Sequence, residues 1–105
     1  SEFMQSKKVT KYDLGDGIRH DTGHEKRVVQ EVFESALEQL KIALKDGATI
    51  ELRGFGTFEL RLRKERKKAR NPKTGDSLSV PPHYIVAFRS GQDLKKAVWN
   101  LSVEE

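Results

Sequence analysis

The fold is decided by residues 50–75, IELRGFGTFELRLRKERKKARNPKTG, in which the spacing of the apolar residues changes twice. Ile50 and Leu52 alternate with charged residues, and the same alternation resumes after the Gly54-Phe55-Gly56 punctuation and continues to Leu62. A period of two residues is typical of strands with one apolar face. We therefore expect two antiparallel strands joined by a tight turn.

The alternation stops from Arg63 to Arg70, where only Ala69 is non-polar, although a turn signal with Pro72 and Gly75 lies ahead. Alternation returns only at Leu78 and Val80. This hairpin outruns any core, and a two-stranded ribbon without an apolar face is marginal alone. The pattern predicts a projecting arm over about residues 61–80 that is mobile when free and ordered on its partner.

The same segment carries the cationic charge of the chain. Residues 61–73 contain eight Lys or Arg and one Glu, whereas the remaining residues have 12 basic against 15 acidic side chains. Such a concentrated charge is either an ordinary solvated run or a polyanion-binding surface, and nucleic acid is the commonest polyanion. A ribbon two strands wide suits a duplex groove, so we expect double-stranded DNA as the partner.

The tip of the arm carries Pro72, which has no backbone N–H and is rigid. Such a residue either slides between base steps in the minor groove and kinks the duplex, or only presets the turn. The local sequence leaves both interpretations open.

Upstream, the spacing of apolar residues predicts two helices. Thr10 and Asp13 are expected to cap the first, and Thr22 to Glu25 read as a capping box for the second, which ends at Gly47. The apolar face of the second helix is wider than one thin sheet can cover, so we infer a homodimer with this helix near the interface. Its members are Val28, Val29, Val32, Phe33, Ala36, Leu37, Leu40, Ala43 and Leu44.

Downstream, Tyr84 to Phe88 form the return strand of the sheet, and Ser90 to Asp93 are expected to cap a short last helix. Trp99 in this helix is either a platform for stacking bases or a packed anchor beside Val98 and Leu101; the anchor is the expected role. The fold class that follows is α+β.

Length and composition restrict the class of protein to which the chain can belong. A chain of 105 residues is one domain of modest core, without cysteine, bilayer-spanning run or signal pattern, so we expect a cytoplasmic protein without cofactor. Ser1 to Phe3 resemble a cloning remnant. We expect residues 1–8 to be this remnant and a flexible tail, residues 9–101 to be the domain, and residues 102–105 to be a second tail.

Two other functional classes compete with DNA binding. His20, Asp21 and His24 have metal-like spacing but no third strong ligand nearby, and Asp13 and Asp16 with Asp21 are too dispersed for a nuclease centre. We therefore expect no metal, no catalytic residue and no small-molecule substrate. The basic arm could also dock on acidic proteins, whereas it lacks the apolar face of a membrane binder.

Three motifs resemble the signature of the HU and integration host factor proteins of bacteria. They are Gly54-Phe55-Gly56-Thr57-Phe58, Ala69-Arg70-Asn71-Pro72-Lys73-Thr74-Gly75, and Phe88-Arg89 followed by Gly91 and Leu94-Lys95. The resemblance covers Val9 to Leu101. The sequence departs from the usual pattern at Ser90 and Gln92, where proline and lysine are common in relatives.

The resemblance implies an intertwined dimer with two N-terminal helices, a three-stranded antiparallel sheet extended into β-ribbon arms, and a short C-terminal helix. Its arms would embrace the minor groove of DNA in the nucleoid and bend it, with Pro72 inserted between base pairs. The implied contacts on the arm are Arg61, Arg63, Lys64, Arg66, Lys67, Lys68, Arg70, Asn71 and Lys73, and those on the body are Lys11 and Lys95.

Arg53 is a further candidate contact. Glu51 and Arg53 resemble the strand residues through which one integration host factor subunit reads sequence, although they could equally be an exposed cross-strand pair. General packaging and sequence-guided bending therefore stay open, as do a homodimer and a heterodimer with a related chain.

Overall fold

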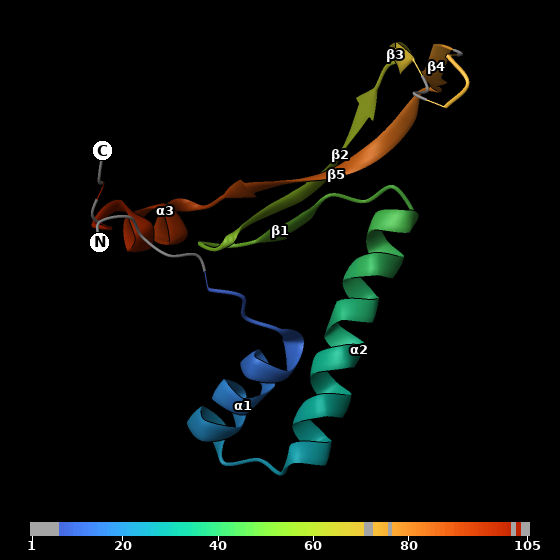
Figure 1. Ribbon diagram of the computed structural model, residues 1–105. Helices are drawn as coiled ribbons and strands as arrows, with labels where there is room; N and C mark the ends of the chain where they lie inside the picture. Colours follow the sequence, from blue (N-terminus) through green and yellow to red (C-terminus); the bar gives the residue numbers. More distant parts are fainter. Residues whose placement is uncertain (1–6, 71–72, 76, 102, 104–105) are drawn as a thin grey trace.

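The computed structural model of the chain describes residues 7–70, 73–75, 77–101 and 103 (Figure 1). The elements are α1 (Lys11–Thr22), α2 (Lys26–Lys45), β1 (Ile50–Leu52), β2 (Gly56–Arg63), β3 (Arg66–Arg70), β4 (Ser77–Val80), β5 (His83–Ser90) and α3 (Gln92–Trp99). The helices α1 and α2 form a hairpin on one side of the sheet, and α3 lies at the end of the sheet remote from β3 and β4 (Figure 1). The predicted α+β class is confirmed.

The first helix begins as the sequence predicts. The Thr10 hydroxyl accepts from the Asp13 N–H at 3.3 Å, and the Asp13 carboxylate accepts from the Thr10 N–H at 2.9 Å. This reciprocal pair satisfies two N–H groups that the helix leaves unpaired. The hydrogen bonds from the backbone and hydroxyl of Thr10 favour the carboxylate and hold the pKa of Asp13 below its ordinary value.

The predicted capping box of the second helix is wrong. Thr22 is the last residue of α1, and its hydroxyl donates to the Ile18 carbonyl at 2.8 Å. Gly23 ends α1 in the left-handed conformation with φ of 77°, and α2 starts after Glu25 without a side-chain cap. The same hydroxyl accepts from the His24 N–H at 3.3 Å, but α2 begins only at Lys26, so this bond lies in the loop before the helix.

Strands β1, β2 and β5 form an antiparallel sheet in the order β1-β2-β5. Ile50 pairs with Phe58 across β1 and β2, and Phe58 pairs with Phe88 across β2 and β5. The rings of Phe55 and Phe88 lie 5.6 Å apart between centroids, and those of Phe58 and Phe88 lie 4.8 Å apart. Aromatic side chains therefore fix the register at the turn end of the sheet.

The arm is a separate two-stranded sheet of β3 and β4. Arg63 pairs with His83 at the end of the main sheet, and Arg66 pairs with Val80 at the start of the arm, so the register continues across the gap. Pro81 and Pro82 fill this gap on the return strand. Because proline has no N–H to donate, it interrupts the ladder without shifting the register.

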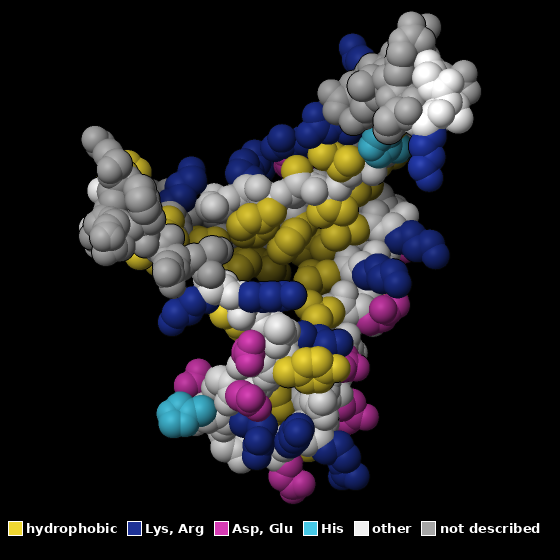
Figure 2. All heavy atoms as spheres, in the orientation of Figure 1, with side chains coloured by type: hydrophobic (Ala, Val, Ile, Leu, Met, Phe, Trp, Pro, Cys, Tyr) yellow, Lys and Arg dark blue, Asp and Glu magenta, His cyan; other side chains and the backbone are white. Residues whose placement is uncertain are grey.

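Exposure on β5 is inverted relative to an ordinary sheet. Tyr84, Val86 and Phe88 form its apolar face and are 67%, 55% and 42% exposed, whereas Ile85 and Ala87 on the opposite face are half-buried. Figure 2 shows hydrophobic side chains gathered in the angle between the sheet and α2. An apolar face that is more exposed than the polar one lacks a layer of the core.

The chain is also too open to be stable alone. Among the described residues Val29 is the only buried hydrophobic side chain. The radius of gyration is 19.3 Å, compared with about 13 Å for a compact domain of this length. A single chain therefore buries too little apolar surface to offset its conformational entropy.

The last helix is capped by the backbone of the β1–β2 turn, so the predicted side-chain cap from Ser90 to Asp93 is wrong. Ser90 is the last residue of β5, and Gly91 is the N-cap of α3 without a side-chain cap. The N–H groups of Asp93 and Leu94 donate to the Gly54 carbonyl at 3.1 and 3.3 Å. This contact requires glycine at position 91, where a Cβ would lie 2.7 Å from the Gly54 carbonyl oxygen.

Gly91→Ala is therefore expected to lower the free energy of unfolding by more than about 2 kcal/mol, because the clash is with backbone that cannot rotate away. Gly17→Ala is the matched control, since no atom lies within 4 Å of its added Cβ. In the interior of α1 this change should stabilise by about 1 kcal/mol. Denaturant unfolding followed by circular dichroism measures the free energy of unfolding of both variants. Equal effects would contradict the close packing of Gly91 on Gly54.

Trp99 does not pack against the described part of its own chain, although the sequence predicts a packed anchor. Its side chain is 83% exposed in the described chain. Val98 and Leu101 are adjacent in sequence, but at 100° per residue Trp99 points away from the apolar side of α3. The prediction from neighbouring residues therefore placed Trp99 on the wrong side of α3.

Candidate nucleic-acid interface

The polar face of the sheet collects arginines from two strands. Thr57, Glu59, Arg61 and Arg63 of β2 share this face with the residues paired opposite them on β5, and Arg89 pairs with Thr57. The guanidinium groups of Arg61 and Arg89 lie 3.4 and 3.5 Å from the two carboxylate oxygens of Glu59. Figure 2 shows Lys and Arg side chains along this edge of the molecule, rising toward the arm.

Glu59 holds these two arginines in place on the sheet. Its side chain is 26% exposed, whereas those of Arg61 and Arg89 are 57% and 62% exposed. The guanidinium groups keep donors that can reach a phosphate, because each has five N–H bonds. The face is thus positioned for polyanions while its excess charge is partly balanced.

Arg89 was missed as a site residue by the sequence reasoning, which used it only as part of a family motif. The period of two residues in the return strand could have indicated this role, because it places Arg89 on the same strand face as Ile85 and Ala87. Only the pairing of Thr57 with Arg89 shows that this row faces the same way as Arg61.

The arm residues continue from this face. Lys64 is exposed at the junction between the two sheets, and β3 carries Arg66, Lys67, Lys68 and Arg70 along one strand of the ribbon. A bulge between Lys68 and Arg70 shifts the pairing by one residue. Such a bulge increases the local twist, which suits a ribbon that follows a groove.

The tip is only partly described. Asn71 and Pro72 lie outside the described residues, so their assigned roles stay predictions. Lys73 is exposed in the turn that leads to Gly75, whose φ of 76° is left-handed.

The predicted body contacts Lys11 and Lys95 lie on different helices, and the further candidate Arg53 lies in the β1–β2 turn that packs against the start of α3. Lys11 is the first residue of α1, and its Nζ is 3.3 Å from Glu34 Oε2 on α2 and 5.5 Å from the Tyr12 ring centroid. Arg53 is exposed in the β1–β2 turn, and Lys95 is exposed on α3. The structure therefore gathers Arg61, Arg63 and Arg89 on one face but does not bring Lys11 to it (Figure 1).

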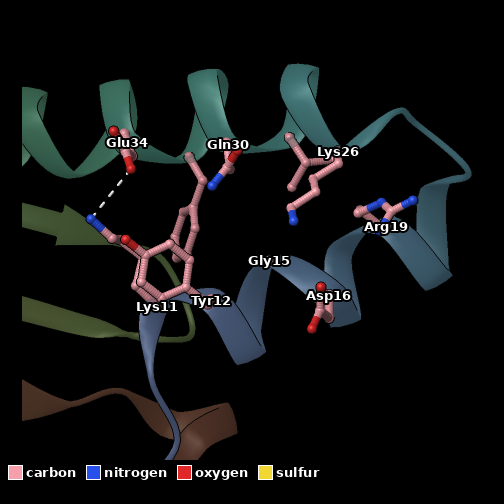
Figure 3. Close-up of a pocket in the computed structure, with 10 residues that line it drawn as sticks. Lys11, Tyr12, Gly15, Asp16, Arg19, Lys26, Gln30 and Glu34 are labelled. Carbon is pink, nitrogen blue, oxygen red and sulfur yellow. Dashed lines mark ion pairs between the residues drawn. The ribbon is translucent and has the colours of Figure 1, made fainter.

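A cavity of about 240 Å³ lies between α1 and α2. Figure 3 shows Lys11 and Glu34 paired at one side of it, with Lys26 and Arg19 at the other and Asp16 at its rim. Opposite charges line it in similar number, which gives no preference for an anionic ligand. Throughout the described ranges, no group of three His, Asp or Glu side chains could hold a metal ion.

Comparison with known proteins agrees with this geometry. The sequence pattern described as bacterial DNA-binding protein matches residues 9–99. Integration host factor subunit alpha of Vibrio atlanticus is 39% identical over 97 residues, which cover 92% of this chain and 98% of the relative. The same subunit of Aliivibrio fischeri is 41% identical with the same coverage.

Solved structures show the same fold. The Anabaena HU–DNA cocrystal structure superposes with a TM-score of 0.81 at 33% identity, covering 88% of this chain and 99% of that one. An HU variant from Thermotoga maritima superposes with a TM-score of 0.63 at 26% identity, covering 86% of this chain and 99% of that one. The chain belongs to the bacterial DNA-binding protein family, as its motifs predicted. In the part of the chain that is described, no helix has the length and hydropathy needed to cross a bilayer.

Proposed function

We propose that this protein is a non-catalytic architectural protein that binds the minor groove of double-stranded DNA and bends it, in association with the bacterial nucleoid. The observation that carries the proposal is the basic ribbon of β3 and β4, which continues in register from the arginine-bearing face of the sheet and projects beyond it (Figure 1). Phosphates of one duplex can contact both surfaces. The family and the HU–DNA relative support this assignment.

The active unit is an intertwined dimer. The exposed apolar row of Tyr84, Val86 and Phe88 and the apolar hollow beside Leu44 and Leu60 need a second chain to cover them. Two copies related by a two-fold axis would cover each other's apolar faces and present two arms. Because the relatives named above are subunits designated alpha, native mass spectrometry of the isolated chain also decides whether this chain pairs with itself.

The phosphate contacts assigned to the arm are Arg61, Arg63, Lys64, Arg66, Lys67, Lys68, Arg70, Asn71 and Lys73. Arg89 joins Arg61 on the sheet, while Arg53, Lys11 and Lys95 are assigned to the flanks of a bent duplex. Phosphate contacts determine affinity and register, whereas sequence preference arises from groove shape and deformability. The ratio of affinities for chosen and random duplexes at fixed salt distinguishes sequence-guided bending from general packaging.

Pro72→Ala tests the wedge. We expect the Kd for duplex DNA to change by less than about fivefold while the bend angle falls, because charge and intercalation are separate contributions. Fluorescence resonance energy transfer between dyes at the two duplex ends measures the bend, and anisotropy measures the affinity.

Pro82→Ala is the control for removing a proline beside the arm, since Pro82 lies in the gap between β4 and β5 and not at the tip. It should bend DNA like the parent. If the Pro72 variant also bends DNA like the parent, the wedge is wrong. If the parent binds duplexes without bending them, the proposed architectural function is wrong.

A further inference from the structure

The outer face of α3 carries an aromatic side chain that packing does not use. Positions 92, 95, 96 and 99 are spaced by three and four residues, so Gln92, Lys95, Lys96 and Trp99 share one side of the helix. Positions 94, 97 and 98 carry the apolar residues of the helix and lie about half a turn away around the axis. Trp99 is therefore on the cationic face.

This face is hollowed and open to solvent. Gln92, Lys95, Lys96, Trp99 and Asn100 line a shallow depression, and the indole of Trp99 is 83% exposed. None of these lining side chains is acidic. The Asp93 carboxylate lies over Gly54 at the β1–β2 turn, where a Cβ on Gly54 would be 2.7 Å from its oxygen. Both lysine charges thus remain uncompensated by the residues that form the depression.

A large exposed aromatic ring between two cations has a specific ligand chemistry. Proteins that bind single strands combine a cationic track for phosphates with rings on which bases stack. Bases inside a duplex are already stacked on each other and cannot cover the indole. A hydrophobic protein partner binds an apolar patch, whereas this face has one aromatic ring flanked by charged side chains.

We propose that the outer face of α3 binds unpaired nucleotides of DNA, with Trp99 stacking on a base and Lys95 and Lys96 contacting the adjacent phosphates. This goes beyond bending of a duplex by the arms. Because α3 lies at the opposite end of the sheet from β3 and β4, this face is separated from the arm on each chain (Figure 1). Lys95 also belongs to the proposed duplex flank contacts, whereas Trp99 and Lys96 belong to this face alone. Either function can therefore fail while the other holds.

Trp99 is the only tryptophan of the chain, so its fluorescence reports this site directly. Titration of the full-length protein with an oligodeoxythymidylate should quench the emission in a saturable way, because a stacked base quenches indole. Covalently closed circular plasmid DNA at the same nucleotide concentration, which has no strand ends, should quench it far less. Acrylamide should quench the free protein efficiently and the oligonucleotide complex weakly.

Substitutions separate stacking from bulk hydrophobicity. With a labelled oligonucleotide, Trp99→Leu should weaken binding at least about fivefold, whereas Trp99→Phe should retain most of the affinity. Lys95→Gln together with Lys96→Gln should weaken it and flatten its salt dependence. The triple variant Arg66→Ala, Lys67→Ala and Lys68→Ala should still show saturable quenching of Trp99, even if duplex binding is lost.

The proposal is overturned if Trp99 emission does not change when anisotropy shows that the oligonucleotide is bound. It is equally overturned if the Leu variant binds as tightly as the parent. A blue-shifted emission that acrylamide cannot quench in the free protein would show that a second polypeptide covers the indole, and this also excludes the site. If the protein does not bend a duplex but Trp99 emission is still quenched by the oligonucleotide, the proposed function of the arms is wrong and the site on α3 stands.

Discussion

Val86→Asp is expected to abolish the folded dimer, with a rise of more than about 100-fold in the dimer dissociation constant. Val86 lies on the apolar face of the sheet and is 55% exposed in the single chain, so the second chain must cover it in the proposed dimer. Burial of an unpaired carboxylate there costs at least about 3 kcal/mol, a large part of the stability of a small protein. Sedimentation velocity and circular dichroism measure both the association and the helical content.

Val103→Asp makes the same chemical change at a position that is 87% exposed and outside the apolar face. It should leave both measurements unchanged. A Val86 variant that remains a folded dimer would show that the second chain does not cover this row. A parent that is a folded monomer at micromolar concentration would refute the dimer altogether.

The second large effect is expected from the arm charges. Replacing Arg66, Lys67 and Lys68 together by alanine should weaken duplex binding at least about tenfold in ~0.1 M salt, because each phosphate contact releases condensed counterions. The slope of log affinity against log salt should fall by about 2.7 for each arm that is in contact. Anisotropy titrations at several salt concentrations give both numbers.

The matched control removes three positive charges at the α1–α2 end of the molecule: Arg19→Ala, Lys26→Ala and Arg27→Ala. These residues belong to the end of α1 and the start of α2, which meet at the end of the helical hairpin away from the sheet (Figure 1). Their loss changes the net charge equally but should leave the slope nearly intact. If the two triple variants lose the same slope, net charge and not the arm determines binding.

Much of the fold could be predicted from the sequence because its determinants are local. The alternation of Ile50, Leu52, Phe58, Leu60 and Leu62 defines one apolar strand face whatever it packs against. The cap of α1 was predictable for the same reason, since the hydroxyl and the carboxylate that form it are three residues apart. The family motifs led to the correct family.

The errors concern residues that had a choice of partner. Thr22 bonded back to Ile18 and left α2 without a side-chain cap, and Ser90 stayed in β5 while the Gly54 carbonyl capped α3. Trp99 was expected to anchor the last helix because Val98 and Leu101 are its neighbours in sequence. The Thr22–Ile18 bond and the helix angle of Trp99 are local features that compete with the predicted cap and anchor, whereas the Gly54 carbonyl that caps α3 comes from a distant turn.

The sequence by itself determined the strand faces, the first helix cap, the concentration of positive charge in residues 61–73 and the family. Those features depend on side chains within a few residues of each other, where spacing fixes geometry. Only the tertiary structure placed Arg89 beside Arg61 around Glu59, interrupted the ribbon at Pro81 and Pro82 without loss of register, and capped α3 with the Gly54 carbonyl. Pairing between strands and the contact of the β1–β2 turn with α3 set these positions, because they join residues that are distant along the chain.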